Sequence, residues 1–255
     1  MVQNGRIQKL HYLSNRKIVF LPSQEIIGGH GGWYMRLYSS SRWLLRSLLQ
    51  FRKTVAHFLP FYHQYNACVF NRRYRKGSTS WVDISHGLFN WLSRLREEAF
   101  TLVPEGRVLD IGCGDGALTS RLSENSREVI GLDISSEAVK RAKEHEHENL
   151  KFFVHNIERD PLMGDNSLII CEDVLYYVPF ISMRKVAKKL SDALILGGIL
   201  LVIDYLPEDM DTRYYYRLLS RSLTPIRIEP VTYKPENARF MMAVYRKTEV
   251  SNDGS

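Results

Sequence analysis

The sequence predicts an α/β protein in which a mostly parallel, seven-stranded β-sheet carries helices on both faces, with a helical N-terminal extension ahead of it. From residue 107 on, short runs rich in β-branched residues alternate regularly with amphipathic runs. Such alternation is typical of βαβ units, whose strands pair in parallel. In addition, only residues 234–237 separate the last two β-like runs, which predicts a hairpin and therefore an antiparallel last strand.

Each element is assigned from its composition and its apolar spacing. The expected strands are 107–111, 128–133, 150–154, 167–173, 197–205, 225–233 and 238–247, and the expected helices are 83–100, 117–124, 136–147 and 182–194. The N-terminal third has a different pattern. Apolar residues recur at helical spacing between residues 43 and 58, and a basic link rich in Tyr and Asn covers residues 65–80.

Charge divides the chain into the same two parts. The formal net charge is +7, but residues 1–100 hold 15 Lys and Arg against 4 Asp and Glu, and the remainder holds 20 against 24. We therefore expect a basic, partly helical extension over 1–77, an α/β domain over 78–248 and a flexible tail over 249–255. A basic amphipathic helix can contact an anionic surface or partner peripherally, although packing on its own domain is the more frequent role of such a helix.

Several classes of protein are disfavoured. No apolar run approaches the roughly 18 to 20 residues that span a bilayer, and the first 30 residues lack the order of a signal peptide. Cys68, Cys113 and Cys171 have neither disulfide nor zinc spacing. His145 and His147 are two apart on an expected helix, so they point in different directions and predict no metal site. A cytoplasmic location fits these features best.

The run "RVLDIGCGDGALTSRL", residues 107–122, predicts a ligand site. A strand that enters a glycine-rich turn and then a helix N-terminus lets the backbone approach a ligand closely. "GCGDGA" also satisfies a variant of the dinucleotide fingerprint, with Asp133 about 20 residues on, where a ribose-binding acid is expected. However, Asp115 would repel a pyrophosphate, and Asp110 can orient the loop and reach the amino-acid end of a cationic ligand. A loop lined by carboxylates therefore matches the positive sulfonium and ammonium of S-adenosylmethionine.

Motifs along most of the chain from about Ser78 resemble those of class I S-adenosylmethionine-dependent methyltransferases. They are "VLDIGCGDGALTSRL", "VIGLDISSEAVKRAK", "FFVHNIERDPL", "SLIICEDVLYYVP" and "ILGGILLVID", in that order and spacing. The resemblance implies a Rossmann-like fold and an S-adenosylmethionine cofactor. Within that superfamily, "STSW", "DIS" and "EDVLYY" are similar to the nodulation-type N-methyltransferases, which act on the amine of a deacetylated chitooligosaccharide.

The resemblance also implies roles for individual residues. Gly112 and Gly114 would line the methionyl part of the cofactor, Asp133 would bind the ribose hydroxyls, and the adenine would lie between Ile134 and Ile157. Asn156 stands where the family often has Asp, and its amide oxygen can still accept a hydrogen bond from the adenine amino group. The predicted cofactor-binding residues are Asp110, Gly112, Cys113, Gly114, Gly116, Asp133, Ile134, Asn156, Ile157 and Glu172.

Methyl transfer requires the acceptor to be held in line with the methyl group and water to be excluded. If the acceptor is an amine, Asp173 or Tyr177 could orient it or take up its proton, and Asp173 is the first choice. Packing is the simpler role for Tyr177 and for its neighbour Tyr176.

The sequence leaves three functions open. The favoured one is an enzyme that methylates a small molecule or saccharide at an amine nitrogen. The second is an RNA methyltransferase that uses the basic N-terminal region for nucleic-acid binding. It is disfavoured because no RNA-binding module is visible and "CEDV" replaces the Asn-Pro-Pro-Tyr-like motif of many base methyltransferases. The third is a cofactor-binding partner protein without catalysis.

Overall fold

A computed structural model describes residues 62–76, 85–103, 105–206 and 213–249. Within these residues, seven strands form one sheet in the order β3-β2-β1-β4-β5-β7-β6. The strands are β1 (Arg107–Ile111), β2 (Glu128–Asp133), β3 (Leu150–Val154), β4 (Asn166–Glu172), β5 (Leu194–Tyr205), β6 (Thr224–Tyr233) and β7 (Ala238–Arg246). The helix expected around residues 43–58, the "STSW" segment and residues 250–255 lie outside the described residues.

The pairing of the strands confirms the predicted fold. Strands β1 to β5 pair in parallel, and β7 pairs antiparallel with both β5 and β6. The hairpin between β6 and β7 turns at Lys234–Glu236 and at Asn237, whose φ of 50° places it in the left-handed region that Asn tolerates.

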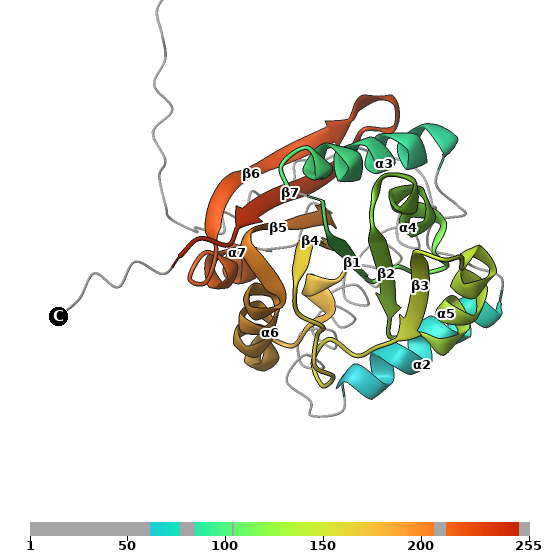
Figure 1. The fold of residues 1–255 in the computed structure, drawn as a ribbon. Coiled ribbons are helices and arrows are strands. Elements are labelled where there is room, and N and C mark those ends of the chain that lie inside the picture. The colour runs from blue at the N-terminus through green and yellow to red at the C-terminus, as the bar shows by residue number, and fades with distance from the viewer. Residues whose placement is uncertain (1–61, 77–84, 104, 207–212, 250–255) are drawn as a thin grey trace, which may run out of the picture. The chain divides into compact units, whose positions relative to one another are not determined.

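Helices cover both faces of the sheet (Figure 1). They are α2 (Tyr62–Arg75), α3 (His86–Phe100), α4 (Ala117–Leu122), α5 (Ser136–Ala142), α6 (Phe180–Ala193) and α7 (Arg213–Leu219). Side chains of α6 and α7 pack on one face, and side chains of α3, α4 and α5 pack on the other. The sheet is therefore buried from both sides, as parallel sheets generally are.

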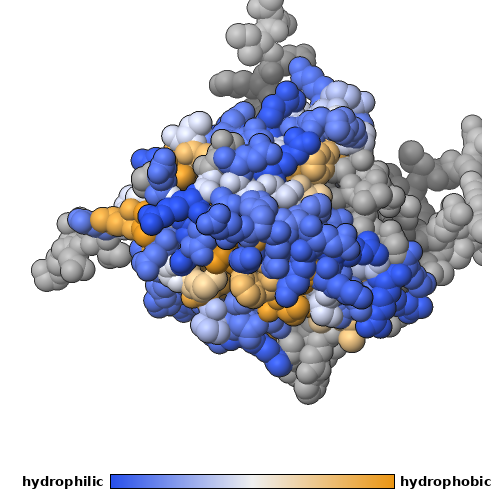
Figure 2. Space-filling view, turned by 45° about the vertical axis from the view of Figure 1, so that its right-hand side comes forward, coloured by the Kyte–Doolittle hydropathy of each residue, from blue (hydrophilic) through white to orange (hydrophobic). Residues whose placement is uncertain are grey.

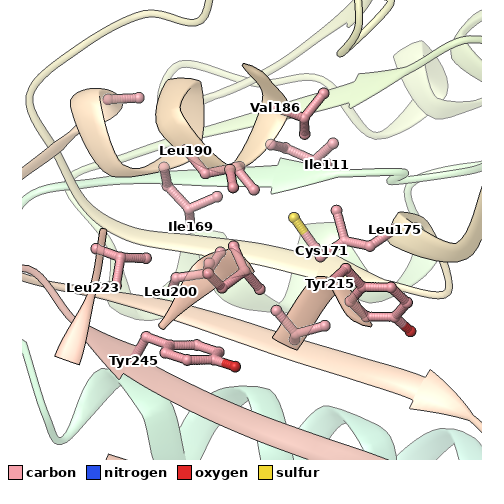
Figure 3. Close-up of a cluster of buried hydrophobic side chains, with 14 of the residues drawn as sticks. Ile111, Ile169, Cys171, Leu175, Val186, Leu190, Leu200, Tyr215, Leu223 and Tyr245 are labelled. Carbon is pink, nitrogen blue, oxygen red and sulfur yellow. The ribbon is translucent and has the colours of Figure 1, made fainter. Parts of the chain in front are cut away.

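Alternation along the central strands explains the two cores. In β4, Ile169 and Cys171 point to the α6–α7 side, while Leu168 and Ile170 point to the opposite side. Figure 3 shows the first of these cores, where Val186 and Leu190 of α6 approach the β1 and β4 side chains. On the face shown in Figure 2, hydrophilic side chains dominate, and hydrophobic ones form separate patches between them.

Phe152 of β3 fills the space beside two glycines. Its side chain is fully buried, and a Cβ at Gly131 of β2 would overlap its ring. A Cβ at Gly116 would come within 2.8 Å of the same ring. The ring therefore supports the underside of the glycine-rich turn at the place where side chains are absent.

The segment assigned to a basic link contains the helix α2, which continues to Arg75. Asn71 joins it to α5: its Oδ1 accepts hydrogen bonds from the Ser135 hydroxyl at 2.7 Å and from the Glu137 N–H at 3.2 Å. Arg75 also pairs with Glu137, with 2.8 Å between Nε and Oε1. The boundary expected at residue 78 falls in 77–84, outside the described residues.

Candidate active site

A cavity of about 340 Å³ opens at the carboxyl ends of β1, β2, β3 and β4. In the sheet order β1 stands between β2 and β4, so the crossovers leave it in opposite directions at this point. Such a reversal creates a crevice outside the strand ends, where open α/β sheets bind their ligands. The topology therefore positions the cavity.

The glycine-rich turn forms one side of the cavity. Gly112, Gly114 and Gly116 all have positive φ, at 83°, 58° and 81°, a backbone conformation that side chains disfavour. Gly112 lines the cavity, and a Cβ there would overlap Val174 Cγ2. The glycines thus allow both the sharp turn after β1 and the close approach of the segment after β4.

Asp133 ends β2 and lines the cavity beside this turn. Its carboxylate accepts hydrogen bonds from the Gly114 N–H at 3.0 Å and from the Ser135 N–H at 2.8 Å. Burial raises the pKa of Asp133 to about 6, and these two N–H donors oppose the rise. At neutral pH the group is an acceptor for hydroxyl donors, which is the chemistry that ribose binding needs.

Residues after β2 and β3 form the far end of the cavity. Ile134, Asn156 and Ile157, which the resemblance predicts to bind adenine, all line it. Asn156 Oδ1 already accepts a hydrogen bond from the Glu158 N–H at 2.9 Å, which fixes the orientation of the amide. Its second lone pair is the one with which the predicted adenine contact would be made.

Asp110 does not line this cavity, because it is fully buried beneath the glycine-rich turn. Arg96 of α3 donates from Nη1 to Asp110 Oδ2 at 2.8 Å and from Nε to Glu172 Oε2 at 2.7 Å. Thr119 also donates to Asp110 Oδ2, at 2.6 Å. The acids at the ends of β1 and β4 are therefore joined by one buried guanidinium.

Glu172 and Asp173 close the cavity where β4 ends. Asp173 has a φ of 53°, and its Oδ1 accepts a hydrogen bond from the Tyr205 N–H at 2.7 Å. Burial raises the pKa of Asp173 to about 8. The hydrogen bonds from Tyr205 and Tyr176 oppose this rise, while the charges of Glu172 and Asp204 add to it. This carboxyl group consequently changes its protonation state near neutral pH.

Aromatic rings form the wall next to Asp173. Tyr176 and Tyr177 lie in the turn after β4 with 4.4 Å between ring centroids, and Phe70 of α2 meets Tyr177 edge to face at 5.1 Å. Asn66 of α2 donates to the Tyr177 carbonyl at 3.3 Å. Helix α2 therefore contacts both the aromatic wall next to Asp173 and, through Asn71, the start of α5.

The structure brings eight of the predicted site residues to the cavity wall. They are Gly112, Asp133, Ile134, Asn156, Ile157, Glu172, Asp173 and Tyr177. Asp110, Cys113, Gly114 and Gly116 lie in or under the turn and do not line this cavity. Within the part of the chain that the structure describes, no cluster of His, Cys, Asp and Glu is placed to hold a metal ion.

Sequence analysis missed two contributions to the site. Four residues of α2 line the cavity, although the composition of their segment predicts a link. They are Asn66, Phe70, Arg73 and Tyr74. Arg96 was not singled out at all. Its signal was present, because Arg96 follows Leu92 by four residues and precedes Ala99 by three, so a cation stands on the apolar stripe of α3.

The residues present fit S-adenosylmethionine. Asp110 Oδ1 and Glu172 Oε1 are buried and have no hydrogen-bond partner among the described groups, and Glu172 lines the cavity, so its free oxygen can accept from a cation bound there. The glycine-rich turn gives close backbone access, and Asp133 offers an acceptor for hydroxyls. An apolar surface from Ile134 and Ile157 completes the set that this cofactor requires.

Comparisons with known proteins agree with this assignment. Residues 102–223 match the family model of a methyltransferase domain. Nodulation protein S from Azorhizobium caulinodans is 35% identical over 74 residues, which are 29% of this chain and 36% of that protein. A ubiquinone biosynthesis O-methyltransferase from Erwinia tasmaniensis is 31% identical over 78 residues, 29% of this chain and 32% of the other. The chain thus spans about a third of the length of each of these curated relatives.

A solved structure has the same fold. It is the N-methyltransferase NodS from Bradyrhizobium japonicum WM9 in complex with S-adenosyl-L-homocysteine, with a TM-score of 0.61 and 17% identity, covering 71% of this chain and 99% of that one. None of the helices in the described residues is sufficiently long and apolar to cross a membrane. The domain match and the curated relatives show that this chain contains a segment similar to methyltransferase domains, and the solved structure shows that it shares their fold.

Proposed function

We propose that this protein transfers the methyl group of S-adenosylmethionine to an amine nitrogen of a small molecule or saccharide, with Asp173 as the group that takes up the proton of the acceptor. The observation that carries the proposal is the Asp173 carboxyl at the cavity wall, whose pKa is raised to about 8. A general base works best when its pKa lies near the operating pH.

The proton balance explains why a carboxylate is needed. When bound, the cofactor supplies a methyl group on a positively charged sulfur, which keeps the electron pair of the broken C–S bond. The acceptor nitrogen uses its lone pair for the new C–N bond, so an amine that arrives as an ammonium ion must first lose one proton to a base. Asp173 can receive that proton only in its ionised form, with the Tyr205 N–H holding Oδ1 in place.

The neighbouring rings support an acceptor of this class. Tyr176, Tyr177 and Phe70 present aromatic surface beside the carboxyl group. Aromatic faces attract cations and pack against apolar sugar faces, so they suit both an amine and the saccharide that carries it. The likeness to Nodulation protein S favours deacetylated saccharides as the first acceptors to test.

The test measures formation of S-adenosylhomocysteine with glucosamine oligosaccharides and with the matched N-acetylated oligosaccharides. We expect transfer to the free amine only, at a rate that rises with pH through about 8 as Asp173 ionises. Asp173→Asn should lower kcat by about 10²- to 10⁴-fold and remove this rise. Transfer to hydroxyl groups alone, with Asp173→Asn as active as the wild type, would contradict the proposal.

Tyr177→Phe serves as the companion variant in the same assay. It keeps the ring that meets Phe70 and removes only the hydroxyl. Unchanged kcat and KM would assign Tyr177 to packing, whereas a loss in kcat without a change in cofactor affinity would assign its hydroxyl to orientation of the acceptor.

A further inference from the structure

Arg96 occupies an unusual place for a charged residue. It lies on α3, ahead of the first strand, and its side chain is only 2% exposed. Its two bonded nitrogens reach carboxylates 14 and 76 residues away, Asp110 under the glycine-rich turn and Glu172 at the end of β4. One guanidinium therefore ties together the two strand ends between which the cavity opens.

The bonding leaves one oxygen of each acid unused. Arg96 and Thr119 occupy Asp110 Oδ2, and Arg96 occupies Glu172 Oε2. Asp110 Oδ1 and Glu172 Oε1 are buried and unpartnered among the described groups. Buried polar atoms are rarely left in this state, so they indicate a ligand or a water.

The spaces around this network also point to a ligand. Glu172 and Gly112 line the large cavity. A second cavity of about 10 Å³, close to the size of one water, is lined by Arg96, Gly112 and Cys113 among others. Gly112 lines both spaces, so the glycine-rich turn adjoins both the Arg96 guanidinium and the large cavity.

We propose that Arg96 is a positioning residue that holds Glu172 at the cavity wall, with Oε1 free to accept the ammonium group of the cofactor's methionine part, while it fixes Asp110 beneath the glycine-rich turn. The inference rests on S-adenosylmethionine as the cofactor and not on the identity of the acceptor, because binding alone tests it.

Electrostatics explains why a cation is needed here. Two buried carboxylates close together do not both stay ionised without a counter-charge. Burial raises the pKa of Glu172, and the charge and hydrogen bond of Arg96 oppose the rise. Arginine suits the position better than lysine because its planar fork reaches two carboxylates at once and stays charged when buried. The pKa of Arg96 is in fact raised by the coulombic attraction of Asp110 and Glu172, which outweighs the effect of desolvation.

Two ligands separate this role from general support of the turn. S-adenosylhomocysteine carries the ammonium group, whereas 5′-methylthioadenosine has the same adenosine and sulfur without ammonium or carboxylate. Calorimetric titration of the full chain with each ligand should show that Arg96→Met raises the Kd of S-adenosylhomocysteine at least tenfold at pH 7. The Kd of 5′-methylthioadenosine should stay within twofold.

The pH dependence provides a second readout. Without Arg96 the charge and hydrogen bond that oppose the rise of the Glu172 pKa are lost, so the loss of S-adenosylhomocysteine affinity in Arg96→Met should shrink as the pH is raised within the range where the ligand's ammonium group stays protonated. Arg94→Met is the matched control, because Arg94 is exposed on the same helix. It should leave both Kd values unchanged at every pH.

Arg96→Lys keeps the test decisive if Arg96→Met does not fold. It retains the charge and loses the fork, so we expect a smaller selective loss for S-adenosylhomocysteine. An equal loss for both ligands, in whichever variant folds, would overturn the proposal and leave Arg96 with a role in packing. Wild-type affinity of Arg96→Lys and Arg96→Met for S-adenosylhomocysteine would overturn it as well.

Discussion

Asp173 combines a left-handed backbone with a carboxyl group that ionises late. Its φ is 53°, and its pKa of about 8 compares with the ordinary value of 3.8. Asp and Asn are the side chains that most readily tolerate such a φ, so Asp173→Asn changes the charge without adding strain. This allows the charge to be tested apart from the backbone.

Because of Asp173, the free energy of unfolding should fall as the pH rises. The unfolded chain releases the Asp173 proton near pH 4, whereas the folded chain keeps it until about pH 8. The favourable contribution is complete below pH 4 and is lost as the pH rises through 8. We therefore expect Asp173→Asn to gain about 4 kcal/mol of unfolding free energy relative to the wild type as the pH is raised from 5 to 8.5, measured by urea unfolding.

Asp192→Asn is the control for this measurement, because Asp192 is exposed on α6 and pairs with the solvent-facing Lys188. Its stability should follow the wild type within about 0.5 kcal/mol at every pH. A wild type whose stability does not fall between pH 5 and pH 8.5 relative to Asp173→Asn would contradict the raised pKa.

Among individual residues, the sequence predicts those whose role depends on a local motif. The glycines and Asp133 follow from the strand–turn–helix pattern, because a tight turn requires positive φ at fixed positions. The Arg96 network depends on carboxylates 14 and 76 residues away, so no window of the sequence contains it. The same holds for the raised pKa of Asp173, which arises from burial by several separate segments.

Among the elements, α2 departs most from what the sequence predicted. Its polar composition resembles a link because it attaches to the domain by specific hydrogen bonds and ring contacts rather than by a continuous apolar stripe. Sequence periodicity detects the second kind of attachment and not the first. The helices α3, α4, α5 and α6, which bury apolar faces on the sheet, lie where that periodicity placed them.

The anchor of α2 can be tested at Asn71. Asn71→Ala removes the acceptor for the Ser135 hydroxyl and the Glu137 N–H at the start of α5, so we expect a loss of about 1 kcal/mol in unfolding free energy. Calorimetry should also show a several-fold weaker affinity for S-adenosylhomocysteine, because Ile134 lies next to the released hydroxyl.

Asn71→Asp supplies the comparison. It keeps an oxygen at the same place and puts a negative charge near the N-terminus of α5, which the helix dipole favours. Stability and affinity close to the wild type would support the anchoring role, while losses equal to those of Asn71→Ala would contradict it.

Two features of the sequence predict the architecture of the described domain. Alternating strand and helix signals led to the parallel sheet, and the short connection at 234–237 led to the antiparallel last strand. The sheet order then determines where the cavity lies. By contrast, the basic charge of residues 1–100 predicts contact with an anionic surface or partner. Most of these residues lie outside the described part of the chain.

Ligand-induced stabilisation tests the cofactor for the molecule as a whole. A ligand that binds only the folded state at 100 times its Kd adds about 2.7 kcal/mol to the free energy of unfolding. We expect this gain, seen in thermal unfolding, with S-adenosylhomocysteine and none with NADH, whose pyrophosphate Asp115 in the glycine-rich turn would repel. Asp133→Ala should lose most of the gain, and stabilisation by NADH alone would contradict the assignment.

The ring of Phe152 beneath the glycine-rich turn has a consequence for how such sequences can diverge. Its volume fills the space that side chains at Gly131 and Gly116 would need. A larger residue at position 131 is therefore accommodated only if position 152 becomes smaller in the same lineage, and a small residue at 152 leaves a void until 131 grows. Positions 131 and 152, on neighbouring strands, should accordingly vary together among homologues, while Gly116 remains fixed by its positive φ as well.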